Sequence, residues 1–168
     1  AEGRVVSAAE LVAELAEWAA AYPIVSYEDP VAEDDWEGWH IATQELGDLQ
    51  LLGDDFLVTN LQRLELAIER GLANAVLVKP NQVGTLSDAL AVTERARAAG
   101  YATVLSARSG DTEEDWLADI SVAWATGQIK VGSTMRSERT AKWNRLLRLE
   151  AELGLPFAGR GALATRRS

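Results

Sequence analysis

Short apolar segments recur along this chain at intervals of about 26 residues, the length of one β-strand plus one crossover helix. Five of them begin near residues 24, 49, 75, 102 and 128. Amphipathic stretches that begin at capping residues, such as Ser7, Asn60 and Thr85, flank these segments. Segments that are apolar on both faces and separated by helices predict a parallel sheet covered by helices.

Two parallel architectures fit this pattern: an open, doubly wound sheet and a (β/α) barrel. A nucleotide-binding Rossmann sheet requires a G-x-G-x-x-G turn after its first strand, and this chain has none there. A closed barrel of eight strands takes about 250 residues, whereas this chain has 168. We therefore expect an α/β fold of about five β/α units, followed by a loosely packed tail rich in Gly, Ala and Arg at 155–168.

Composition excludes several kinds of site and partner. The chain has no cysteine and one histidine, His40, so thiolate chemistry is excluded, and a zinc site or a Ser-His-Asp triad is not expected. A net charge of −10 argues against nucleic acid as a partner. No apolar run approaches the roughly 20 residues of a membrane helix. We expect a cytoplasmic protein in which His40 lies on an amphipathic helix and has no catalytic role.

Charged or hydroxyl side chains follow each of the five apolar segments. They are Glu28 and Asp29, Asp54 and Asp55, Lys79, Arg108 and Ser109, and Lys130. In a barrel, the carboxyl ends of the strands converge on one mouth. Carboxylates suit magnesium, a partly desolvated lysine beside a metal can act as a base, and an Arg-Ser pair can hold phosphate. The set predicts proton abstraction beside a metal-bound carboxylate on a phosphorylated substrate.

Each of these residues also has a plainer interpretation, because polar residues follow most strands and serve as loop residues or helix caps. We interpret Asp29 and Asp55 in that way. Lys79 and Lys130 follow three or four mainly apolar residues, which favours a functional position. The recurrence of complementary chemistry at five strand ends favours a site over five unrelated loops. The six tryptophans lie mostly at helical spacing and are expected in the core or an interface.

Six stretches resemble the enolase (phosphopyruvate hydratase) family in order and in spacing: 22–30 (YPIVSYEDP), 32–36 (AEDDW), 53–60 (GDDFLVTN), 78–85 (VKPNQVGT), 106–110 (SARSG) and 127–133 (GQIKVGS). The resemblance continues through 136–144 (RSERTAKWN). It covers essentially the whole chain and corresponds to the last part of the enolase barrel domain. It implies that residues 1–154 are the C-terminal portion of an enolase-type (β/α) barrel, a partial barrel of about five units.

The resemblance also implies roles for individual residues. Glu28 and Asp54 resemble two of the three carboxylates that bind the conformational Mg²⁺. Lys79 resembles the base that takes the proton from carbon 2 of 2-phosphoglycerate, which is the established pattern of the superfamily. Lys130 resembles the lysine that binds the substrate carboxylate. Arg108 and Ser109 resemble the phosphate contacts.

Two departures from the family matter. Ala107 stands where enolases usually have the histidine of Ser-His-Arg-Ser-Gly, so turnover or substrate choice is expected to change. The family's third metal carboxylate, general-acid glutamate and lid loop precede the region that this chain resembles. The resemblance therefore implies a companion chain that supplies the enolase N-terminal portion, or a homo-oligomer. A partner would also cover the strand edges of an open half-barrel.

Three functions remain candidates. The first is Mg²⁺-dependent dehydration of 2-phosphoglycerate to phosphoenolpyruvate by an enolase-type lyase. The second is an enolase-like enzyme for a phosphonate analogue, of the kind that makes carboxyphosphonoenolpyruvate. The third is a non-catalytic, enolase-like binding fragment. Retention of all six residues favours chemistry over a relic: Glu28, Asp54, Lys79, Arg108, Ser109 and Lys130.

Overall fold

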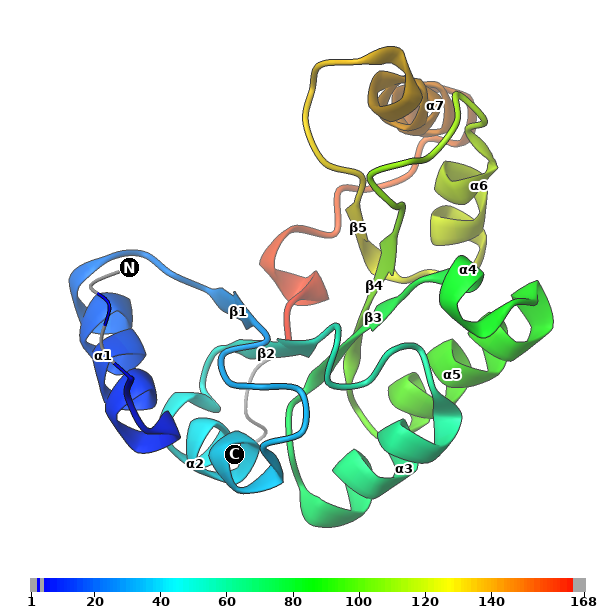
Figure 1. Cartoon of the computed structure of the whole chain (residues 1–168). Coiled ribbons are helices and arrows are strands. Elements are labelled where there is room, and N and C mark those ends of the chain that lie inside the picture. The colour runs from blue at the N-terminus through cyan, green and yellow to red at the C-terminus, as the bar shows by residue number, and fades with distance from the viewer. Residues whose placement is uncertain (1–2, 4, 165–168) are drawn as a thin grey trace.

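The computed structural model describes residue 3 and residues 5–164. Helices and strands alternate along this part of the chain (Figure 1). In order they are α1 (Ala8–Ala21), β1 (Ser26–Glu28), α2 (Trp36–Leu46), β2 (Gln50–Gly53), α3 (Leu61–Arg70), β3 (Ala75–Val78), α4 (Pro80–Val83), α5 (Leu86–Ala98), β4 (Ala102–Ser106), α6 (Trp116–Ala123), β5 (Gly127–Lys130), α7 (Ser137–Leu153) and the 3₁₀-helix η1 (Gly159–Ala162).

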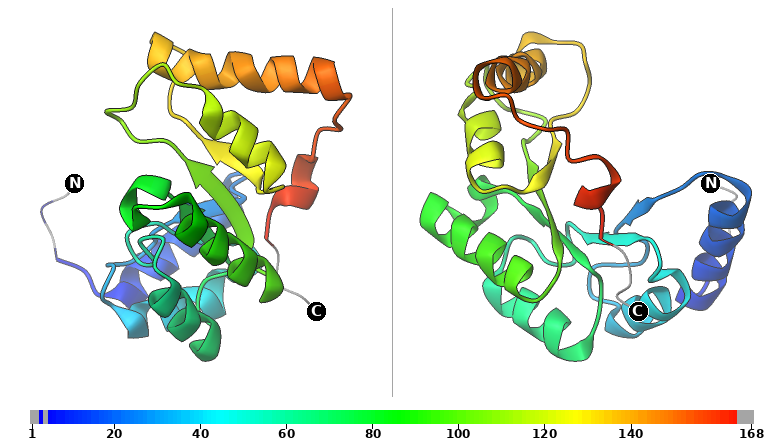
Figure 2. Two further views of the ribbon diagram at one scale, coloured as in Figure 1. Left: turned by 90° about the vertical axis from the view of Figure 1, so that its right-hand side faces the viewer. Right: turned by 180° about the vertical axis from the view of Figure 1, so that it is seen from behind.

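The five strands form one sheet in the order β1-β2-β3-β4-β5, and every neighbouring pair is parallel. The sheet curves into a half-barrel with the helices on its convex side, and the segment that contains η1 lies in the hollow of the curve (Figures 1 and 2). The register pairs Val78 with Leu105 and Ser106 with Lys130, so the carboxyl ends of β3, β4 and β5 lie level. The predicted parallel α/β fold with five units is confirmed.

Most predicted boundaries are confirmed to within two residues, and the local chemistry explains them. Ser7 and Glu10 form the expected capping box at the start of α1. Asn60 caps α3, which ends at Gly71 in the left-handed conformation (φ 65°). The sequence of residues 111–126 predicts one helix there, but the observed α6 is shorter at both ends and spans Trp116–Ala123. The single turn α4, which begins at Pro80, is not predicted from the sequence.

Alternate residues of the strands face two separate apolar layers. The larger layer lies between the sheet and the helices and includes Leu51, Val76 and Leu105, none of which is exposed. The smaller layer lies on the other face of the strands and consists of Leu52, Ala75, Leu77, Val104 and Ala164. β2 and β3 are buried along their whole length, whereas β1 and β5 are partly exposed because they are the edge strands.

A polar bridge crosses the concave face near the amino ends of the strands. The side-chain amides of Gln50 on β2 and Gln128 on β5 donate to each other's oxygens at 3.0 and 2.8 Å. Gln128 Nε2 also donates to the carbonyl of Ala162, and the Ala164 N–H donates to Gln50 Oε1. In the predicted tail, residues 155–158 are exposed, Ala164 is buried against the sheet, and 165–168 lie outside the described residues.

His40 lies where the sequence predicts it, but the expectation of buried tryptophans holds only in part, because Trp18 and Trp116 are 47% and 43% exposed. Trp39 on α2 is fully buried and stacks on Phe56 with ring centroids 4.1 Å apart, and Trp36 meets the same ring edge-on. His40 is exposed, and its Nε2 hydrogen-bonds the Gln44 side chain one turn later at 2.9 Å. Within the described residues, no helix is long and apolar enough to cross a membrane.

Candidate active site

Four of the six predicted site residues meet at the carboxyl ends of the strands. Glu28 is the last residue of β1 and Lys130 the last of β5, while Asp54 and Lys79 directly follow β2 and β3. The curvature of the sheet brings its two edge strands to the same mouth. Glu28 and Lys130 therefore touch although 102 positions separate them along the chain.

Cations and carboxylates alternate in this group, which we call the charged centre: Glu28, Asp54, Lys79 and Lys130. The Lys79 ammonium donates to Asp54 Oδ1. Lys130 Nζ donates to Glu28 Oε1 at 2.5 Å and lies 3.7 Å from Asp54 Oδ2. Asp54 thus faces both lysines, and each carboxylate has an ammonium partner.

The charged centre has a buried half and an open half. Lys79 and Asp54 are each 8% exposed, while the side chains of Lys130 and Glu28 are 45% and 35% exposed. Burial raises the pKa of Glu28 above its ordinary value. The hydrogen bond from Lys130 opposes this shift in the pKa of Glu28, and the neighbouring Asp54 carboxylate adds to it. Two carboxyl groups that repel each other in this way favour a cation between them.

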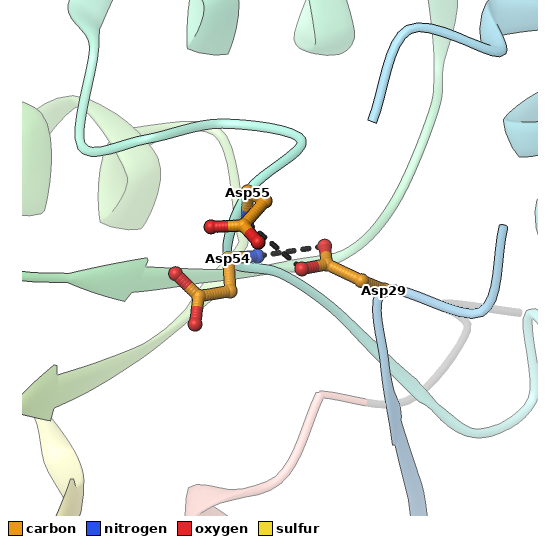
Figure 3. Close-up of side chains that lie close together, drawn as sticks. All are labelled: Asp29, Asp54 and Asp55. Carbon is orange, nitrogen blue, oxygen red and sulfur yellow. Dashed lines mark hydrogen bonds between the residues drawn. The ribbon is translucent and has the colours of Figure 1, made fainter. Parts of the chain in front are cut away.

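Asp29 holds the loop that presents Asp54. Its carboxylate accepts the backbone N–H groups of Asp54 and Asp55 at 2.9 and 2.8 Å (Figure 3). Burial raises the pKa of Asp29, and these backbone hydrogen bonds oppose the shift. Carboxylate oxygens of Asp29, Asp54 and Asp55 lie within 4.8 Å of one another. Both Asp29 oxygens accept backbone N–H groups and Asp55 is exposed, so Asp29 serves as a loop cap in this structure, and the interpretation of the two as residues without a further role stays a prediction.

Arg108 and Ser109 lie apart from the charged centre. Both are exposed, two and three residues beyond the end of β4. In the described part of the chain, no hydrogen bond or ion pair joins either residue to the charged centre. Arg108 lines a cavity of about 330 Å³ together with Pro80, Ser106 and Ala107. Pro80 directly follows Lys79, and Ser106 pairs with Lys130, but none of the four residues of the charged centre is among the residues that line this cavity.

A buried lysine that is not among the predicted site residues also lines this cavity. Lys142 on α7 is 1% exposed, and its Nζ donates to the carbonyls of Thr112 and Glu138 at 2.6 and 2.8 Å. The same ammonium lies 3.3 Å from Asp111 Oδ2. It thereby ties the loop that carries Arg108 to α7. No local pattern marks Lys142, because a lysine within a polar helix ordinarily faces solvent.

The donor set of the charged centre fits magnesium. Glu28 and Asp54 offer carboxylate oxygens, which are the ligands that Mg²⁺ prefers, and the two ammonium groups now neutralise them. Two protein ligands are few, but Mg²⁺ retains several waters and is commonly held by one or two carboxylates. A cation there would sit beside both lysines.

One protein family matches nearly the whole chain. The family model described as "Enolase, C-terminal TIM barrel domain" matches residues 1–166. The matched region contains the charged centre, Arg108 and Ser109.

Proposed function

Because the chain belongs to the enolase C-terminal TIM barrel family, we propose that it carries the reactive centre of an enolase-type lyase. The reaction is the removal of water from 2-phosphoglycerate to give phosphoenolpyruvate. One observation carries the proposal: two lysines and two carboxylates from four different strand ends form a single network at the mouth of the half-barrel.

In this proposal Lys79 is the base that takes the proton from carbon 2. Its side chain is buried beside the mouth, where a group held against Asp54 has little freedom to move. A neutral amine is needed for this step, so Asp54 would have to be engaged elsewhere while Lys79 works. When bound by Glu28 and Asp54, Mg²⁺ would supply positive charge that stabilises the ene-diolate.

Lys130 would bind the substrate carboxylate. Its side chain is half exposed, and its present partner is the Glu28 carboxylate, which is also partly open to solvent. A carboxylate of the substrate is chemically equivalent to that partner. The Lys130 side chain would hold the developing negative charge close to Lys79.

Arg108 and Ser109 would hold the phosphate. A guanidinium can form two parallel hydrogen bonds to phosphate oxygens, and a hydroxyl adds a third. Both side chains are exposed on the loop after β4, and Arg108 lines the cavity that Pro80, the residue after Lys79, also lines. Neither residue is tied to the charged centre, so phosphate binding and proton abstraction would be separable.

We also propose a cytoplasmic protein that works with a companion chain or with a second copy of itself. The support is physical: within the described residues, β1 and β5 each pair with one neighbour only, which leaves one edge of each strand open. The resemblance places the third metal carboxylate and the general acid outside this region, so the complete site would need them from elsewhere.

A phosphonate analogue of 2-phosphoglycerate is the second candidate substrate. The small side chain of Ala107 lines the cavity beside Arg108, where the family usually has histidine. The space that an imidazole would take is thus available to a differently shaped substrate. The two substrates differ in the groups near the phosphorus, which Arg108 would contact in either case.

The decisive experiment follows exchange of the carbon-2 proton with deuterated solvent, in the full protein with any chain that copurifies. Lys79→Ala and Lys79→Arg should both lose at least about 10²-fold in exchange rate, since general-base steps contribute roughly 10²–10⁴-fold. Lys79→Arg retains a cation for Asp54 but cannot act as a base near neutral pH. Both substrates are assayed with each protein. Exchange by Lys79→Arg at the parent rate, on the substrate that the parent turns over, would refute the proposal.

A further inference from the structure

The loop that presents Asp54 ends in an unusual backbone conformation. Val58 and Thr59 have positive φ values of 43° and 53°. Two successive β-branched residues in the left-handed region are outliers, because their Cβ substituents crowd the backbone there. Such a conformation persists only where the surroundings impose it. Thr59 is fully buried, so its contacts identify what imposes it.

The Thr59 hydroxyl closes a ring of hydrogen bonds with Lys79 and Gln82. It accepts the backbone N–H of Lys79 at 2.8 Å and lies 2.9 Å from Gln82 Oε1, to which it donates. The backbone N–H of Gln82 in turn donates to the Lys79 carbonyl at 2.9 Å. Both polar groups of the Lys79 backbone are therefore held, and Thr59 holds one of them directly.

Lys79 depends on this ring because regular structure offers its backbone N–H no other partner. It follows the last residue of β3 and precedes Pro80, the first residue of α4. Its side chain reaches back to Asp54, at the other end of the loop that Thr59 closes. The loop of six residues, 54–59, thus forms two hydrogen bonds with Lys79: Thr59 bonds its backbone N–H, and Asp54 bonds its ammonium.

We propose that Thr59 is a positioning residue for Lys79, whose hydroxyl fixes the lysine backbone and thereby places the ammonium against Asp54. We call this double hold on Lys79, through Thr59 and Asp54, the clamp. The clamp rests on geometry, whereas its catalytic consequence rests on the proposed function. It also explains the residue type: the left-handed backbone favours Gly or Asn, whereas the buried Lys79 N–H and Gln82 amide oxygen require a hydroxyl between them.

The test compares Thr59→Val, which removes only the hydroxyl, with Thr59→Ser, which retains it. Thr93→Val is the matched control, because Thr93 is equally buried and its hydroxyl donates to the Ala89 carbonyl within α5. The chain has three lysines, at 79, 130 and 142, so an amine-reactive reagent followed by peptide mass spectrometry measures each separately. Lys142, which is 1% exposed, is the internal standard.

The reagent should label Lys79 several-fold faster in Thr59→Val than in the parent, whereas the labelling of Lys142 should be unchanged. Its kcat should fall roughly 10- to 100-fold at a nearly constant KM, since misplacing a reacting group by about 1 Å can cost 10²-fold. Thr59→Ser should restore both values to near those of the parent. Thr93→Val should alter stability but neither Lys79 labelling nor kcat.

Unchanged labelling of Lys79 in folded Thr59→Val would overturn the clamp, whatever reaction the protein catalyses. Faster labelling with an unchanged kcat would overturn its catalytic consequence. A parent protein with no turnover would count against the proposed function, and labelling would then still decide whether Thr59 places Lys79. If Thr59→Val does not fold, Gln82→Met opens the ring from the other side and should also raise Lys79 labelling; parent-level labelling there would overturn the inference.

Discussion

At the scale of single residues, the site consists of charged side chains that are stabilised at the strand ends by their oppositely charged neighbours. Lys79 and Asp54 are both 8% exposed; removing Asp54 leaves the buried Lys79 ammonium without its carboxylate partner, whereas removing Lys79 leaves Asp54 with Lys130 at 3.7 Å. Glu28 and Lys130 are more open and therefore easier to separate. Ligand exchange should accordingly begin at the outer pair, where a substrate carboxylate or a cation meets the least desolvation.

Magnesium binding should depend on Glu28 and Asp54. We expect Glu28→Gln and Asp54→Asn each to weaken the binding of Mg²⁺ at least about tenfold, since each removes one of few charged ligands. Titration calorimetry on the assembled protein measures this directly. Asp55→Asn, at an exposed carboxylate of the Asp29–Asp54–Asp55 group, should bind Mg²⁺ like the parent. If only Asp55→Asn lost affinity for Mg²⁺, the Mg²⁺ site would have to be assigned to the Asp29–Asp54–Asp55 group.

Tyr101 should make the protein lose stability in alkaline solution. Its hydroxyl donates to the Leu72 carbonyl, and burial raises the pKa of the phenol. The unfolded chain releases this proton near pH 10 while the folded protein retains it, so the free energy of unfolding falls above that pH, by up to about 1.4 kcal/mol per pH unit. Urea unfolding at pH 9 and 11 should show a smaller fall for Tyr101→Phe than for the parent. Tyr22→Phe, at an exposed tyrosine, should follow the parent.

At the scale of elements, the loops after the strands carry the chemistry, and neighbouring elements hold them in place. The loop after β2 is capped by Asp29 from the β1 end and anchored by Phe56, which stacks on Trp39 of α2. Among the described residues, no ring–ring contact of this kind anchors the loop after β4. It is held instead by Lys142 of α7, whose ammonium donates a hydrogen bond to the Thr112 carbonyl and forms an ion pair with the Asp111 carboxylate.

Lys142→Met should therefore loosen the loop at residues 107–115 while leaving the charged centre in place. The change removes the hydrogen bond to the Thr112 carbonyl and the ion pair with Asp111, which are the contacts between this side chain and the loop. Hydrogen exchange read by mass spectrometry should show faster exchange in peptides covering 107–115, and KM for the phosphorylated substrate should rise. Asn144→Ala, at an exposed position on the same helix, is the control. Equal exchange in both variants would contradict a holding role for Lys142.

At the scale of the whole molecule, two polar bridges span the concave side of the half-barrel. Lys130 and Glu28 join β5 to β1 at the carboxyl end, and Gln128 and Gln50 join β5 to β2 near the amino end. Through these two bridges, side chains of the edge strand β5 contact β1 and β2 on the opposite side of the half-barrel. The C-terminal segment is part of the second bridge, through the Ala162 carbonyl and the Ala164 N–H.

Gln128→Leu should destabilise the protein by about 1–3 kcal/mol, because Gln50 is 2% exposed and its amide would lose both hydrogen bonds to Gln128, although those to Ser26 and Ala164 remain. The midpoint of urea unfolding should fall accordingly. Gln44→Leu is the control, since Gln44 is exposed on α2 and its side chain hydrogen-bonds the exposed His40; a change within about 0.5 kcal/mol is expected there. Equal losses in the two variants would mean that the bridge adds nothing to stability.

Much of this molecule is determined by local sequence patterns. The repeat of strand and helix predicted five parallel strands, and Ser7, Asn60 and Thr85 marked the starts of three helices correctly. The residues after the strands also came from the sequence, because the carboxyl end of a parallel strand is a defined position. These features depend on hydrophobic period and capping chemistry, which act over a few residues and are visible in any short window.

Only the tertiary structure decided which of those residues meet. Glu28 touches Lys130 because the sheet curves through five strands, and no local pattern records that curvature. The roles of Thr59 and Lys142 were invisible for the same reason: each side chain bonds main-chain groups that are distant in sequence, and its own neighbours give no sign of it. The sequence alone determined the strands and the chemistry at their ends, whereas long-range packing selected the partners, because charge pairing and burial depend on distances that only the folded chain sets.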